Sequence, residues 1–197
     1  SDDIPFNRAF PLLAGVVDQA RPGGRRVLCN NPSPFTFTGT VSYIVGKGKV
    51  AIIDPGPDDE AHAKALLDAV RGETVTHIFV THTHRDHSPN TARIKAATGA
   101  TVYAEGPHRA SRPRFESEKH NPESGSDRDF RPDVEVKDGD VVEGSGWALE
   151  AIATPGHTAN HLAFAWVERK INFVGDHVMG WSTSIVAPPD GSMIDYM

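Results

Sequence analysis

Cysteine, long apolar runs and positive charge are all scarce in this chain of 197 residues. Cys29 is the single cysteine, so no disulfide can form within the chain, and we expect a buried thiol in a reducing compartment. No apolar run approaches the roughly 20 residues that cross a bilayer. From the acidic start at Ser1 we expect no signal peptide. The sequence therefore predicts a cytoplasmic protein with no membrane partner.

The charge balance argues against a protein that binds nucleic acid over a broad surface. The net charge is −6 and the pI is about 5.9, so a global basic field is absent, although a local basic groove stays open. A Gly-x-Ser-x-Gly motif and a Ser-His-Asp pattern are also missing, so no side-chain nucleophile is predicted. RNA is therefore less favoured as a partner than a small-molecule substrate, and the sequence leaves the oligomeric state open.

The pattern of apolar residues predicts a mixed α/β (α+β) fold in a single domain over residues 1–197. From Thr38 the order is β-β-α-β-α-β. The expected strands are Thr40–Val45, Lys49–Asp54, Val75–Thr81 and Thr101–Ala104. One helix is expected from Asp59 to about Val70 with Asp58 as its N-cap, and a second is expected to start at Ser88-Pro89 and end before Gly99. Five strands should follow: Val134–Val136, Val141–Glu143, Trp147–Ile152, Leu162–Trp166 and Ile171–Val174.

Two segments fall outside this alternation. Residues 1–35 are rich in Pro, Gly and Arg and predict an extended lead-in with one or two edge strands. Residues 105–133 are polar and almost free of apolar periodicity, which predicts a solvated insertion. The alternative is a flap that meets an anionic substrate through the side chains of Arg109, Arg112, Arg114, Phe115 and Phe130.

The most informative motif is the run His82-Thr83-His84-Arg85-Asp86-His87. It lies between a predicted strand and a predicted helix, on the edge where open α/β sheets usually bind ligands. Three imidazoles and a carboxylate on one tight loop suit a divalent cation such as zinc. Without a cation, such crowded polar groups would be poorly satisfied. The motif therefore predicts a metal site.

Two later segments place further donors at strand ends. His157 follows a strand in Thr154-Pro155-Gly156-His157-Thr158, and Asp176 follows another in Phe173-Val174-Gly175-Asp176. Each residue alone is weak evidence for a ligand. Both follow strands downstream of the histidine motif, so we expect them to lie with the motif in one site.

In its order of motifs, the chain resembles the metallo-β-lactamase superfamily, from about Thr38 to Asp176. The resemblance implies an αβ/βα sandwich and a hydrolase. It implies that the first metal is bound by His82, His84 and His157. It further implies that Asp86 and His87 bind a second metal and that Asp176 bridges the two.

Other residues take supporting roles under the same resemblance. Asp54, which ends its strand before Pro55-Gly56, would orient the ligand loop, and His161 matches a structural histidine. Two cations about 3.5–4 Å apart would lower the pKa of a bridging water, and Asp86 would orient the resulting hydroxide as the catalytic carboxylate. Zinc is the expected metal, with manganese or iron as alternatives.

The chain departs from the family pattern after Asp176. Family members usually supply a later histidine to the second metal, whereas the last histidine here is His177, which should point away from the site. We therefore expect a shortened C-terminus, an incomplete second half of the sandwich and a weak or empty second metal position. The segment from Gly175 to Thr183 resembles the lactamase-beta-like branch, and Trp181 is a candidate pocket residue.

The substrate stays open at this level because the superfamily hydrolyses many bonds on one platform. An ester, thioester, lactone or phosphodiester is expected. One alternative is an iron-dependent oxidoreductase similar to the persulfide dioxygenases, and another is an endoribonuclease of the lactamase-beta-like branch. A catalytically dead relative is disfavoured because Asp86 and Asp176 are both present.

Overall fold

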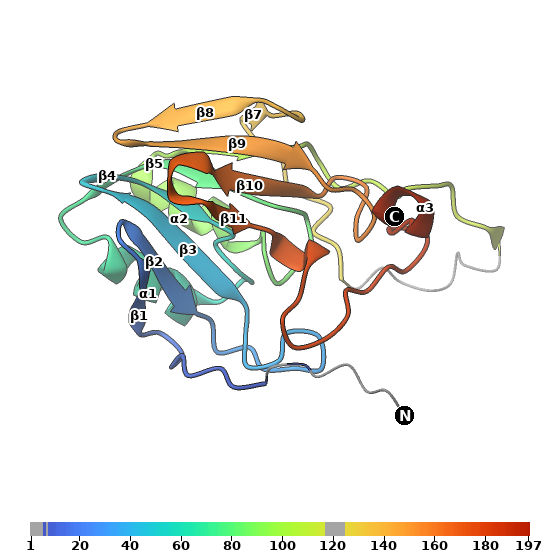
Figure 1. The fold of residues 1–197 in the computed structure, drawn as a ribbon, viewed down its shortest axis with the longest axis horizontal. Coiled ribbons are helices and arrows are strands. Elements are labelled where there is room, and N and C mark those ends of the chain that lie inside the picture. The colour runs from blue at the N-terminus through green and yellow to red at the C-terminus, as the bar shows by residue number, and fades with distance from the viewer. Residues whose placement is uncertain (1–5, 7, 117–124) are drawn as a thin grey trace.

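The computed structural model describes residues 6, 8–116 and 125–197. They form two β-sheets that pack face to face (Figure 1). The larger sheet has the order β1 (Val17–Arg21), β2 (Gly24–Leu28), β3 (Val41–Lys47), β4 (Lys49–Ile53), β5 (Thr74–Phe79), β6 (Thr101–Ala104) and β7 (Val134–Glu135). The smaller sheet has the order β11 (Ile171–Phe173), β10 (Leu162–Trp166), β9 (Trp147–Ala153) and β8 (Val141–Gly144).

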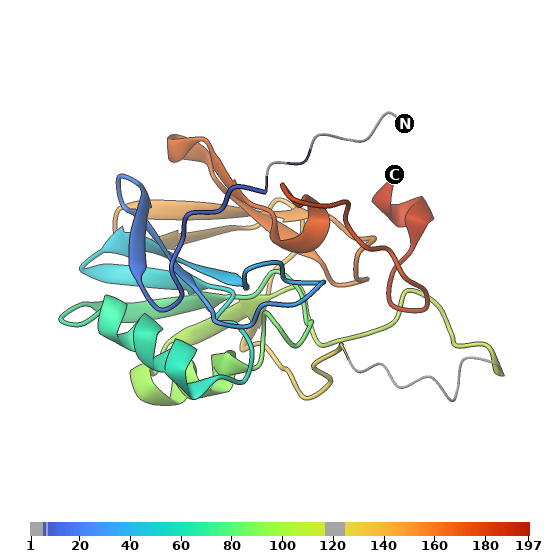
Figure 2. The ribbon, with the colours of Figure 1, turned by 90° about the horizontal axis from the view of Figure 1, so that it is seen from below.

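Helices α1 (Glu60–Ala69) and α2 (Asn90–Thr98) lie together on the outer face of the larger sheet (Figure 2). The short helix α3 (Met193–Tyr196) lies close to the C-terminus, to the right of the sheets in Figure 1. The predicted β-β-α-β-α-β order and the two-sheet α/β architecture are confirmed. Among the described residues, one α-helix, the four-residue α3, follows the strands of the smaller sheet.

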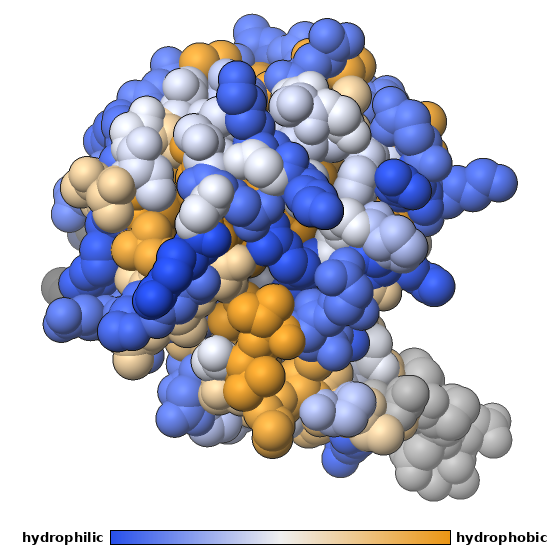
Figure 3. All heavy atoms as spheres, turned by 90° about the vertical axis from the view of Figure 1, so that its left-hand side faces the viewer, coloured by the Kyte–Doolittle hydropathy of each residue, from blue (hydrophilic) through white to orange (hydrophobic). Residues whose placement is uncertain are grey.

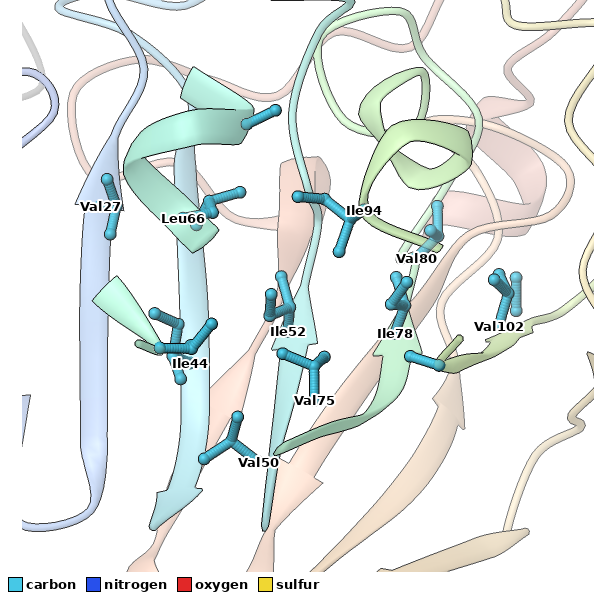
Figure 4. Close-up of a cluster of buried hydrophobic side chains, with 14 of the residues drawn as sticks. Val27, Ile44, Val50, Ile52, Leu66, Val75, Ile78, Val80, Ile94 and Val102 are labelled. Atoms are coloured by element: carbon cyan, nitrogen blue, oxygen red, sulfur yellow. The ribbon is translucent and has the colours of Figure 1, made fainter. Parts of the chain in front are cut away.

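Strand alternation divides the core into two layers. Ile52 faces the helices, where it packs with Leu66 of α1 and Ile94 of α2 (Figure 4). Its neighbour Ile53 faces the other sheet, where it packs in a cluster with Phe164 of β10. Successive residues of β4 thus serve opposite faces, and this sandwiched strand is apolar on both because neither face meets water.

The remaining features of the fold are the N-terminal lead-in, one face of the surface and the lengths of the helices. In the lead-in segment, β1 and β2 form an antiparallel hairpin on the edge of the larger sheet. The face that carries β1 and α1 in Figure 1 is largely hydrophilic, with one apolar area toward the bottom of the view (Figure 3). Within the described part of the chain, no helix has the length and apolar character to cross a membrane.

The predicted helix caps were wrong by one residue at each helix. Asp59, not Asp58, caps α1, and its side chain accepts a hydrogen bond from the backbone N of His62 at 3.0 Å. The Asp58 carboxylate instead accepts a hydrogen bond from Arg93 at 2.8 Å. Ser88 does not cap α2, which begins after Pro89 with no side-chain cap, and the Ser88 hydroxyl donates to Asp127 at 2.7 Å. In both cases the residue predicted as the cap instead forms a hydrogen bond with a distant segment of the chain.

The parallel part of the larger sheet sets where the polar loops lie. Strands β4, β5 and β6 run parallel, so their carboxyl ends meet at one edge. Asp54 ends β4 there, and the histidine motif follows β5. The Asp54 carboxylate accepts hydrogen bonds from the backbone N and the hydroxyl of Thr81, both at 2.8 Å, and contacts Nδ1 of His87 at 3.0 Å. One buried side chain therefore ties the end of β4 to the whole turn after β5.

Asp54 also has a left-handed backbone, with φ of 50°, which asparagine tolerates and alanine does not favour. We therefore expect Asp54→Ala to lower the free energy of unfolding by roughly 3 kcal/mol, because it removes a buried carboxylate and leaves the backbone N of Thr81 without its acceptor. Asp54→Asn keeps one acceptor oxygen and the backbone preference, so it should cost about half as much. Urea unfolding of metal-free protein measures both, and equal losses in the two variants would contradict this account.

Candidate metal centre

Two groups of side chains converge where the sheets meet at this edge. In the first group, potential ligand atoms of His82, His84, His157 and Asp176 all lie within 4.8 Å of one another, and the same holds for a second group of Asp86, His87 and Asp176. His157 follows β9, and Asp176 lies in the 3-10 turn Gly175–His177 after β11. The structure therefore brings together the six residues that the sequence singled out, from both sheets.

The imidazoles of the first group point their nitrogens at one another. Nδ1 of His84 lies 3.1 Å from Nε2 of His82 and 2.8 Å from Nε2 of His157. The rings of His84 and His157 stand edge to face, with an interplanar angle of 89°. This arrangement aims ring nitrogens, rather than ring faces, at a common point.

Neighbouring groups fix which nitrogen carries the proton in the rings of His82 and His157. The hydroxyl of Thr81 donates to Asp54, so its oxygen is left to accept from Nδ1 of His82 at 3.0 Å. Nδ1 of His157 donates to the carbonyl of Ile185 at 2.5 Å. Both rings therefore carry their proton on Nδ1 and present the lone pair of Nε2 to the centre.

A divalent cation fits this set of donors. His84 has one Nδ1 proton at most and cannot donate it fully to both facing nitrogens, so at least one Nε2 lone pair lacks a donor when the centre holds no cation. Burial and the neighbouring His157 lower the pKa of His84 to about 4, and burial also lowers the pKa of His82 well below its usual value. These rings are therefore neutral at physiological pH, which is the form that binds a metal.

The second group differs because it contains a charged histidine. Nε2 of His87 lies 3.4 Å from Asp86 and 3.3 Å from Asp176. Burial lowers the pKa of His87, but the carboxylates of Asp86, Asp176 and Asp54 outweigh burial and raise it well above its usual value. In turn, despite burial, His87 holds the pKa of Asp86 and of Asp176 below the usual range. In the metal-free protein, the proton on His87 thus supplies the positive charge that these carboxylates need.

His161 and His177 lie beside the cluster but belong to neither converging group. His161 stacks on the ring of His82, with ring centres 4.9 Å apart, and its Nδ1 contacts the hydroxyl of Thr154 at 2.8 Å. Gly175 makes this packing feasible, because a Cβ there would lie 2.8 Å from Nε2 of His161. His161 thus packs against a cluster histidine, contacts the turn before His157 through Thr154, and lies close to Gly175 in the turn that carries Asp176.

Two hollows open onto the cluster. A hollow of about 220 Å³ reaches Asp86, His87 and Asp176 and is lined by Trp181, which stacks on Phe37 with ring centres 5.3 Å apart. A second hollow, of about 570 Å³, reaches both groups. Its described lining residues are Asn31, Ser33, Phe35, Thr36, His84, Arg85, Asp86, Gly125, His157, Asp176, Met179, Ile185 and Ala187. Both hollows share the loop that carries Phe35.

The alternative of a flap over residues 105–133 is wrong for Phe130. Phe130 is buried in the core between the larger sheet and its helices, so it does not face a substrate. Arg109 pairs with Glu105 and donates to the carbonyl of Ala159. The guanidinium of Arg112 lies 4.3 Å from the ring centre of Phe115. Residues 117–124 of this segment lie outside the described residues.

Sequence reasoning missed the residues that hold the ligand rings and line the larger hollow. Thr81 directly precedes the histidine motif, and its position at a strand end was the available signal. The carbonyl of Ile185 and the ring of Phe35 gave no signal, because backbone acceptors and exposed aromatics at loop tips have no distinctive pattern.

Comparison with known proteins places the chain in a family. The family model of the metallo-beta-lactamase superfamily matches residues 35–196. An atrochrysone carboxyl ACP thioesterase from Claviceps purpurea is 31% identical over 176 residues, which are 86% of this chain and 50% of that protein. Another atrochrysone carboxyl ACP thioesterase, from Paecilomyces divaricatus, is 32% identical over 86% of this chain and 49% of its own length. The chain thus spans about half the length of these curated relatives.

A solved structure supports the fold. A beta-lactamase domain protein from Burkholderia ambifaria superposes with a TM-score of 0.70 at 20% identity, covering 92% of this chain and 63% of that one. The match over residues 35–196 and the two-sheet fold together show that the chain belongs to the metallo-beta-lactamase superfamily.

Proposed function

We propose that this protein is a metal-dependent hydrolase of thioesters. The observation that carries the proposal is the cluster of imidazoles and carboxylates at the base of a hollow whose wall includes Phe35, Met179 and Ile185. The names of the two thioesterase relatives support the choice of bond. An apolar wall suits the acyl chain of a thioester better than the charged backbone of RNA.

The metal positions follow from the two converging groups. We propose that His82, His84, His157 and Asp176 hold one cation, and that Asp86 and His87 hold a second that shares Asp176. Zinc suits nitrogen and carboxylate donors, and manganese or iron are the alternatives. A cation held there would polarise the thioester carbonyl and lower the pKa of water.

The remaining roles belong to side chains of this chain. Asp86 is ionised, since its pKa lies below the usual value, and it lines both hollows. Its carboxylate accepts a hydrogen bond from the attacking water and so orients the water oxygen toward the carbonyl carbon. The apolar side chains of the larger hollow hold the acyl chain and exclude bulk water.

Hydrolysis of hexanoyl-pantetheine tests the proposal. We expect zinc-loaded protein to release free thiol, measured with a thiol reagent, and we expect chelator-treated protein to release none. Asp86→Asn should lower kcat by about 100-fold or more, because it removes the group that orients the water. Asp18→Asn is the matched control, since Asp18 pairs with Arg26 on the β1–β2 hairpin, and it should keep full activity.

Failure to cleave thioesters in any metal form would overturn the proposal. Oxygen uptake by an iron-loaded protein with a persulfide substrate would then favour the oxidoreductase alternative.

Metal uptake at the second position should release a proton from His87. The raised pKa keeps His87 protonated at neutral pH in the metal-free protein, so a cation must displace that proton, and its affinity should rise as pH rises. Because one proton is released, the metal affinity should rise about tenfold per pH unit below the raised pKa of His87. Calorimetry in buffers of different ionisation enthalpy counts the protons. At pH 7, metal binding to wild type should release one proton more than metal binding to His87→Asn. An equal number of released protons would show that His87 is not a ligand.

A further inference from the structure

We propose that Arg85 is a specificity-determining residue that binds an anionic group of the substrate, either a carboxylate or a phosphate. The inference rests on the proposed thioester hydrolysis and narrows its substrate class. Arg85 stands between His84 and Asp86 in the sequence, yet it belongs to neither metal group. It lines the larger hollow beside both of those ligands.

The base of the Arg85 side chain is anchored by a separate segment. Its backbone N donates to the carbonyl of Gly125 at 2.8 Å, and its Nε donates to the carbonyl of Ser126 at 3.2 Å. A β-bridge between His84 and Ser126 joins the same two segments. Backbone carbonyls of Gly125 and Ser126, rather than a carboxylate, therefore position the Arg85 side chain.

The outer nitrogens of Arg85 remain available. Among the described residues, neither Nη of Arg85 has a protein acceptor, whereas Arg25, Arg93 and Arg109 each donate an Nη hydrogen to a carboxylate. A guanidinium that uses Nε for anchoring still presents a fork of donors, which matches the two oxygens of a carboxylate or phosphate.

The charges around the hollow indicate what this fork binds. The two carboxylates that line the hollow, Asp86 and Asp176, face Nε2 of His87 at 3.4 and 3.3 Å, so they belong to the metal groups. Apart from its histidines, Arg85 is the one basic side chain among the described lining residues. A neutral acyl chain does not need it, so the structure assigns an anionic group to the substrate beside the cluster.

Three thioesters locate the anion. Hexanoyl-pantetheine is neutral, glutaryl-pantetheine carries a carboxylate on the acyl side, and hexanoyl-pantetheine 4′-phosphate carries a phosphate on the thiol side. We expect Arg85→Gln to lower kcat/KM by about tenfold or more, mainly through KM, for one of the two anionic substrates and to leave the neutral one unchanged. Arg85→Lys should restore part of the loss. Arg93→Gln is the control, because Arg93 pairs with Asp58 away from the cluster.

The outcomes separate this inference from the proposed function. A loss confined to glutaryl-pantetheine places the anion on the acyl group, and a loss confined to the phosphate places it on the thiol. An equal change for all three substrates, or none, overturns the role of Arg85. If wild type cleaves no thioester, the proposed function fails. Calorimetric binding of pantetheine 4′-phosphate and of glutarate to zinc-loaded protein then tests the anion-binding role of Arg85 by itself. Weaker binding of either by Arg85→Gln supports the anion site, and unchanged binding of both contradicts it.

Discussion

Convergence of imidazole lone pairs on one buried point is the constraint on which the rest of the site depends. His82 and His157 are each held with a proton on Nδ1, so both present Nε2 to Nδ1 of His84. His84 can donate one proton at most, so these neutral rings leave at least one inward-facing lone pair without a partner unless a cation lies among them. Hydrogen bonds that His82 donates to the Thr81 hydroxyl oxygen and that His157 donates to the Ile185 carbonyl hold two of the rings in this arrangement. The side chains are thereby held in an arrangement that could bind a metal ion.

Asp54 links this constraint to the architecture. Its carboxylate contacts Thr81 and His87, so a single group at the end of β4 orients one ring of each proposed metal position. Parallel pairing of β4 with β5 brings Asp54 to that place. The smaller sheet supplies His157 and Asp176 from the other side. The site therefore forms only when the two sheets pack together, which couples the fold to the metal chemistry.

Much of this arrangement could be predicted from the sequence because it has a local signature. The order of strands and helices along the chain follows from apolar and β-branched runs broken by turn residues, and the six potential ligands from His82 to Asp176 follow from the histidine motif and from donor residues at strand ends. Features set by contacts between distant segments could not be predicted. Ser88 donates to Asp127 rather than capping α2, and Phe130 packs into the core rather than over the site. No local pattern encodes either contact.

In the proposed function, three imidazoles and a carboxylate from both sheets bind the first cation. X-ray absorption fine structure of protein loaded with one equivalent of zinc measures this directly. We predict three imidazole nitrogens and an oxygen at about 2.0–2.1 Å, with one imidazole lost in His157→Asn. A shell that contains sulfur from Cys29, or a zinc shell that His157→Asn leaves unchanged, would contradict the claim.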